Sequence, residues 1–241
     1  MRRTLVISLA LGLGGSALAA QTIDSSKAIA GWRDSIAQWP IDSVQAEVDR
    51  TGAPKSPLDR LHTGWLLLTL GGLTDTAGLA ARAMDQFYEV TVRRPRWVEG
   101  WYGLGMAKVA LLSAGAREIR SPHQTAGTGW AQGAANAFLQ AQRVDPPFLP
   151  AAIALAKLTP QLRDRASARE IERRLDQAVA ADGTDPSLWL LVADAATARG
   201  DDAGAVAALQ KAGGLPGAPA GTIRLALARA HFALGDTAAA V

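Results

Sequence analysis

Histidine and cysteine, the side chains most often used for nucleophilic and metal chemistry, are scarce in this chain. None of the 241 residues is a cysteine, which excludes a thiol nucleophile, a cysteine zinc cluster and a disulfide framework. The three histidines, His62, His123 and His231, lie far apart in the sequence, and none belongs to a two-histidine helical metal motif. We therefore expect no metal ion, no cofactor and no enzymatic activity.

Two further patterns could in principle bind phosphate or another anion. The run Gly103-Leu104-Gly105 lacks the next glycine of a dinucleotide-binding loop, and it lies inside a predicted helix instead of after a strand. The densest charge cluster, from Arg163 to Arg174, interleaves acids with bases at helical spacing. Such mixed spacing is typical of a solvated helix face. Neither pattern predicts an anion site.

Residues 1–19 have the layout of a secretory signal peptide. Arg2 and Arg3 precede an apolar run from Leu5 to Leu13, and the small-residue motif Ala17-Leu18-Ala19 follows. The apolar run is shorter than the ~20 residues that cross a bilayer, so we expect cleavage and no stable membrane span. The protein is predicted to be exported, either to the periplasm or out of the cell.

Loss of the signal peptide changes the charge balance. It removes two of the 25 basic side chains and no acid, which leaves 23 basic against 22 acidic side chains. A near-neutral mature chain lacks the net positive field that non-specific nucleic-acid binding uses. We expect no nucleic-acid partner.

The elements that position any site are predicted to be helices in pairs. The chain is rich in Ala, Leu and Gly, and only 5% of its residues are aromatic, which disfavours strands. The expected second helices carry a large apolar residue at steps of 51, 37 and 34: Phe87, Phe138, Leu175 and Leu209. The expected first helices do so at steps of 34, 51, 37 and 35: Leu70, Leu104, Leu155, Val192 and Leu227. Both series place an insertion at the same point, near residues 113–130.

This pattern resembles the tetratricopeptide repeat (TPR), a helix-turn-helix unit of about 34 residues. The best-matching stretches are Trp101-Tyr102-Gly103-Leu104-Gly105 and Ala134, Phe138, Ala141 and Pro146. The resemblance implies an all-α fold, a right-handed superhelix of stacked helix-turn-helix repeats. We expect residues 20–63 to form an N-terminal helical or cap region and linker, and residues 64–241 to form an array of about five repeats, the last incomplete.

The resemblance also implies a binding surface, because first helices line the inner face of a TPR superhelix, which commonly holds a peptide. Carried over by position, the candidate partner-binding residues are Trp65, Glu99, Tyr102, Met106, Leu190, Asp194 and Arg229. The alternative for Trp65, Tyr102 and Met106 is that they simply pack between helices.

The insertion near residues 113–130 supplies a second set of candidates, because long loops in compact arrays are usually functional or disordered. These are Arg117, Arg120, His123 and Trp130. We hypothesise that this loop folds against the groove or touches the partner, with Trp130 as its anchor. Deleting the loop should then weaken partner binding.

The function implied by the resemblance is a non-enzymatic protein–protein interaction scaffold, in the cell envelope or secreted, with a protein or peptide partner. One alternative is the N-terminal, substrate-recruiting part of a larger envelope enzyme whose catalytic region is absent from this chain. Another is a module that binds cell-wall glycan through tryptophans, which a pull-down on wall polymer would test. The apolar residues Leu225, Leu227 and Phe232 lack a polar cap. This predicts a fragment or a homo-oligomer formed through the C-terminal end, which sedimentation at several concentrations would distinguish.

Overall fold

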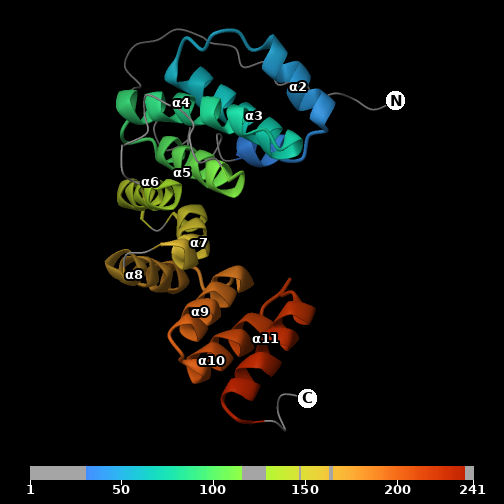
Figure 1. Ribbon diagram of the computed structural model, residues 1–241, viewed down its shortest axis with the longest axis vertical. Helices are drawn as coiled ribbons and strands as arrows, with labels where there is room; N and C mark the ends of the chain where they lie inside the picture. Colours follow the sequence, from blue (N-terminus) through green and yellow to red (C-terminus); the bar gives the residue numbers. More distant parts are fainter. Residues whose placement is uncertain (1–30, 116–128, 147, 163–164, 237–241) are drawn as a thin grey trace.

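The structure is a computed structural model that describes residues 31–115, 129–146, 148–162 and 165–236 (Figure 1). Every regular element in these ranges is a helix, which confirms the predicted all-α fold. The helices are α2 (Ile41–Arg50), α3 (Pro57–Thr74), α4 (Ala77–Arg93), α5 (Val98–Ser113), α6 (Trp130–Val144), α7 (Leu149–Leu158), a short 3₁₀ helix (Thr159–Gln161), α8 (Arg165–Ala181), α9 (Pro186–Ala198), α10 (Asp202–Gly213) and α11 (Ala220–Ala233). Ahead of them, residues 31–36 form a short helix, called the N-terminal segment below. The predicted signal peptide, residues 1–19, lies outside the described residues.

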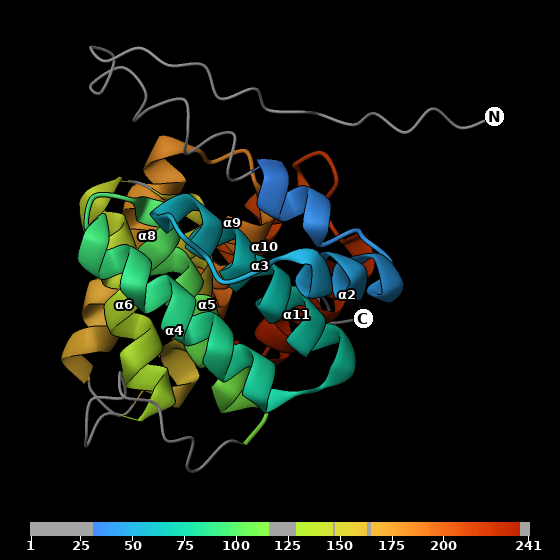
Figure 2. The same cartoon turned by 90° about the horizontal axis from the view of Figure 1, so that it is seen from above.

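Consecutive helices stack along the long axis of the molecule, from α2, α3 and α4 at one end to α11 at the other (Figure 1). The most extensive contacts join α3 to α4, α5 to α6 and α9 to α10, so each pair is one helix-turn-helix unit. The view from above shows α3, α4, α5 and α6 lying side by side (Figure 2). The first helices also touch one another, α3 with α5, α5 with α7 and α7 with α9, and these contacts form one continuous face.

Helix α3 begins at a capping box. The Ser56 hydroxyl accepts a hydrogen bond from the Asp59 N–H at 3.1 Å, and the Asp59 carboxylate accepts one from the Ser56 N–H at 2.9 Å. Pro57 follows at the first helical position, where its missing N–H costs nothing. The first helix of the array therefore starts ahead of Gly64, the residue at which the repeat was expected to begin.

Neighbouring helices approach closely because glycines face phenylalanine rings. Phe87 and Phe138 are fully buried. A Cβ atom on Gly103 would lie 2.4 Å from the Phe87 ring, and one on Gly105 would lie 2.3 Å from the Phe138 ring. Both distances are far shorter than a normal carbon contact of about 3.5–4.0 Å. The glycines of the Gly103-Leu104-Gly105 run thus allow close helix packing. The run lies inside α5, in agreement with its predicted helical position.

Two tryptophans at equivalent repeat positions link first helices to the preceding turns by hydrogen bonds. The Trp101 indole N–H donates to the Pro95 carbonyl oxygen at 2.8 Å, and the Trp189 indole N–H donates to the Gly183 carbonyl oxygen at 2.8 Å. In both cases the acceptor precedes the tryptophan by six residues. The same sequence position therefore performs the same structural task in two repeats.

Substituting Trp101 or Trp189 by phenylalanine is expected to lower the free energy of unfolding by about 1 kcal/mol each. The change removes the indole donor and leaves a carbonyl without its partner, and a net hydrogen bond contributes roughly that much. Urea denaturation followed by circular dichroism measures the effect. Unchanged midpoints for both variants would show that these hydrogen bonds do not stabilise the turns.

Candidate partner-binding groove

The face formed by the first helices is hollowed between α5 and α7. The hollow is a cleft of about 230 Å³. Three α5 residues one helical turn apart, Tyr102, Met106 and Val109, line one wall. The other wall belongs to α7 and the 3₁₀ helix: Pro150, Ile153, Ala154, Lys157, Leu158 and Gln161. The walls are mainly apolar, whereas Lys157 and Gln161 are exposed to solvent.

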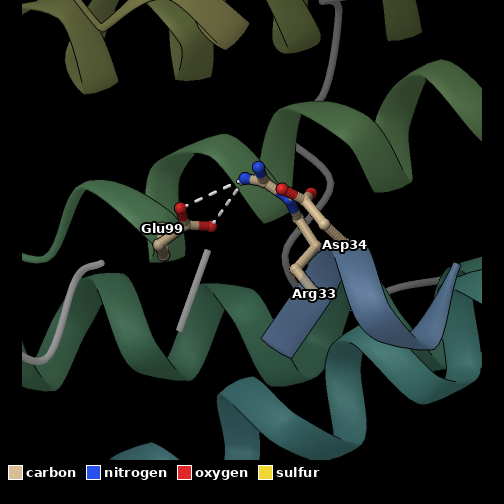
Figure 3. A network of polar contacts seen from close by, with 3 residues as sticks. All are labelled: Arg33, Asp34 and Glu99. Carbon is tan, nitrogen blue, oxygen red and sulfur yellow. Dashed lines mark hydrogen bonds and ion pairs between the residues drawn. The ribbon is translucent and has the colours of Figure 1, made fainter. Parts of the chain in front are cut away.

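The N-terminal segment covers the adjoining part of this face, where α3 and α5 meet. Arg33 reaches from the segment toward Glu99 of α5 (Figure 3). Its Nη1 group donates to both carboxylate oxygens of Glu99, at 3.1 and 3.2 Å, and its Nε group donates to Asp34 at 3.0 Å. The segment is held in place by Ile36, which is fully buried, and by Trp32, which packs on the same core.

Two aromatic rings complete the surroundings of Arg33. The guanidinium carbon lies 5.6 Å from the Trp65 ring centroid and 5.1 Å from the Tyr102 ring centroid, within cation–π range. The Tyr102 ring also packs on Phe138 and Phe148, at centroid distances of 5.8 and 5.4 Å. Because Tyr102 lines the cleft as well, it is a wall shared by the cleft and the Arg33 site.

Glu99 is buried although it belongs to a charged residue type. Its side chain is 2% exposed. Removal from water disfavours the carboxylate and raises the pKa of Glu99 to about 7, against the opposing effect of Arg33. Burial likewise raises the pKa of Tyr102. The site is therefore a weakly hydrated pocket in which a cation interacts unusually strongly with the Glu99 carboxylate.

Comparison with known proteins supports the fold. No protein-family model matches the chain, and no curated protein matches its sequence. Among solved structures, the crystal structure of a thermophilic TPR protein in Thermus thermophilus is similar, with a TM-score of 0.55 and 21% sequence identity. The match covers 89% of this chain and 98% of that chain. The chain has a TPR-like fold. The resemblance predicted from the repeat spacing is confirmed at this level.

The TPR-like array distributes the predicted partner-binding residues unevenly. Trp65 and Glu99, at 5% and 2% exposed, are covered by the N-terminal segment, and Tyr102 is half-buried beside it. Met106 lines the cleft with Tyr102. A role for these four in partner binding stays a prediction.

The remaining predicted residues lie elsewhere. Leu190 on α9 is half-buried, Asp194 on α9 and Arg229 on α11 are exposed, and none of them lines the α5–α7 cleft. Partial removal from water by the neighbouring groups nevertheless raises the pKa of Asp194. Trp130 begins α6 and packs against the core of the first repeats. Arg117, Arg120 and His123 lie outside the described residues, so the loop hypothesis remains a prediction.

Sequence reasoning missed Arg33 and the α7 wall of the cleft. Ile153 and Lys157 follow Tyr102 and Met106 by the same 51-residue step that separates Leu104 from Leu155, so the repeat register could have found them. Arg33 carries no such signal, because the N-terminal segment lies outside the repeats.

The part of the chain that the structure describes contains neither a candidate metal-binding cluster nor a candidate membrane-spanning helix. In it, no group of three or more His, Asp or Glu side chains is arranged to hold a metal ion. No helix among the described residues has the length and apolar character needed to cross a membrane.

Proposed function

We propose that the TPR-like array is a non-enzymatic scaffold that holds a segment of a partner protein in the cleft between α5 and α7. The observation that carries this proposal is the cleft itself, which combines apolar walls with an exposed lysine on the first-helix face. Aromatic, methionine and aliphatic side chains of this kind are suited to protein contacts.

The size of the cleft favours peptide side chains over a small metabolite. Its volume of about 230 Å³ is below the roughly 300–1,000 Å³ of typical small-molecule sites. Met106 is unbranched and can adapt its shape to different side chains. Lys157 adds a positive charge at the exposed side, so the proposed partner segment presents apolar residues next to an acidic one.

We further propose that the protein acts outside the cytoplasm, in the periplasm or after secretion. Support comes from the signal-peptide layout of residues 1–19. A chain without cysteine also folds independently of the oxidising conditions found in those compartments.

A second candidate is the substrate-recruiting part of a larger envelope enzyme. The observation that favours it is an exposed apolar face near α11, where Leu225, Phe232 and Leu234 are 55%, 72% and 49% exposed. Apolar surface of this kind marks a contact site. A catalytic domain encoded beyond Val241 would favour this candidate, whereas concentration-dependent dimerisation would assign the face to a second copy of the chain.

Reversing the charge of Lys157 is expected to reduce capture of the partner from envelope extract roughly tenfold, which corresponds to about 1.4 kcal/mol. The Lys157→Glu change places a like charge opposite the proposed acidic residue. Arg143→Glu is the matched control, because Arg143 is also exposed and also lies in the last turn of its helix, α6, but does not line the cleft. Equal capture by the parent and both variants, or equal loss in both variants, would contradict the proposal.

A further inference from the structure

Arg33 is bound by the array much as a ligand is bound. Its guanidinium group meets the buried Glu99 carboxylate on one side and the rings of Trp65 and Tyr102 on the others. These three partners belong to α3 and α5, whereas Arg33 and its fourth partner, Asp34, belong to the N-terminal segment, which is not one of the paired helices. Figure 3 shows the side chain extending from the segment to Glu99.

The chemistry of these three side chains selects a guanidinium over an ammonium. A guanidinium is planar, weakly hydrated and able to stack on aromatic faces while it donates to a carboxylate. An ammonium is compact and strongly hydrated, so it loses more hydration when it enters a dry site. Because Glu99 is 2% exposed and Arg33 itself is only 16% exposed, an entering cation must give up most of its water. Lysine is therefore disfavoured in this position.

We propose that Trp65, Glu99 and Tyr102 form an arginine-binding pocket, that Arg33 is its built-in occupant, and that the pocket accepts a guanidinium from another molecule once Arg33 is removed. The pocket walls belong to α3 and α5, which pack on each other and on α4. In the free chain the N-terminal segment thus blocks an arginine site that adjoins the α5–α7 cleft through Tyr102. Use of the pocket by a partner protein rests on the proposed function, but its preference for guanidinium does not.

The test titrates the full chain with small cations. The Arg33→Ala variant leaves a space that ethylguanidinium fills, because ethylguanidinium equals the arginine side chain beyond Cβ; n-propylammonium is the matched lysine fragment. Binding is followed by calorimetry at a series of pH values above 7, because the Glu99 pKa of about 7 includes a lowering by Arg33 and rises further when Arg33 is removed. Arg33→Ala is expected to bind ethylguanidinium at least about tenfold more tightly than it binds n-propylammonium. It should also bind ethylguanidinium at least about tenfold more tightly than the parent chain does. Adding Glu99→Gln to Arg33→Ala should abolish this preference.

Equal binding of the two cations, or equal binding by the parent and Arg33→Ala, would overturn the proposal. If Arg33→Ala does not fold alone, recovery of its helical circular dichroism by ethylguanidinium and not by n-propylammonium supports the pocket, and no recovery contradicts it. Adding Lys157→Glu to Arg33→Ala should leave ethylguanidinium binding unchanged. Failure of the partner-groove proposal therefore does not affect this result.

Discussion

Phe138→Ala is expected to lower the free energy of unfolding by about 3–5 kcal/mol, as is typical when a fully buried phenylalanine is truncated. The ring lies between α5 and α6 and contacts Tyr102, so its loss opens a cavity in the centre of the array. Urea denaturation of the parent and the variant measures the change. A loss below about 1 kcal/mol would mean that the helices close around the site without the ring.

The companion substitution Gly105→Ala should also destabilise the chain, by up to about 2 kcal/mol. A Cβ atom at this position would lie 2.3 Å from the Phe138 ring, and such overpacking typically costs about 1–3 kcal/mol. The better helix propensity of alanine offsets about 1 kcal/mol of that cost. In the Phe138→Ala background the clash disappears, so the same change should become neutral or stabilising.

Gly72→Ala is the control for this double-mutant cycle. Gly72 lies in α3, and a Cβ atom there would have no neighbour within 4 Å. The substitution should therefore raise stability by up to about 1 kcal/mol through helix propensity alone. Additive effects of Gly105→Ala and Phe138→Ala would contradict the close packing of glycine against the ring.

The second large effect is a pH dependence caused by Glu99. Its pKa is raised from 4.5 to about 7, so the folded chain keeps a proton that the unfolded chain releases between these values. The contribution of Glu99 to stability is then fully present below about pH 4.5 and is lost as pH rises to about 7. At about 1.4 kcal/mol for each pKa unit, the loss is about 3 kcal/mol. Above pH 7 this contribution should stay constant.

Urea denaturation across this pH range, for the parent and for Glu99→Gln, isolates the effect. Glutamine keeps the shape and an acceptor for Arg33 but cannot ionise, so the variant should lack this loss of stability. His62, whose pKa is lowered by burial, acts in the opposite direction, but its contribution is common to both chains and cancels in their difference. Parallel stability curves would show that Glu99 does not titrate in this range.

Much of the fold followed from the sequence because repeat proteins bury the same positions in each unit. Phe87, Phe138, Leu175 and Leu209 were expected to fill the space between helices, and all are at most 3% exposed. Their spacing carries this information because each helix pair packs chiefly on its neighbours. The packing role of the small residues in α5 could be predicted for the same reason, since a small residue is needed opposite each large one.

The Arg33 site could not be read from spacing. Arg33 and Glu99 are 66 residues apart, and the chain has 25 basic and 22 acidic side chains that could pair in many ways. Helical periodicity identifies only local pairs, such as Glu89 with Arg93. The burial of Glu99 depends on a segment outside the repeats, which the repeat pattern does not place.

These features divide the first-helix face into two parts. Near α3 and α5 it is occupied by the chain's own N-terminal segment, and between α5 and α7 it is open. Tyr102 borders both parts, because its ring faces Arg33 and also lines the cleft.

The central claim, that a partner segment lies in the α5–α7 cleft, is tested most directly by photocrosslinking in living cells. A benzophenone amino acid is placed at Lys157 in one chain and at Arg143 in another. Both positions are exposed, but Lys157 borders the cleft and Arg143 lies on α6. We predict a discrete crosslinked adduct from position 157 and none from position 143. An adduct from position 143 alone, or none from position 157, would contradict binding in this cleft.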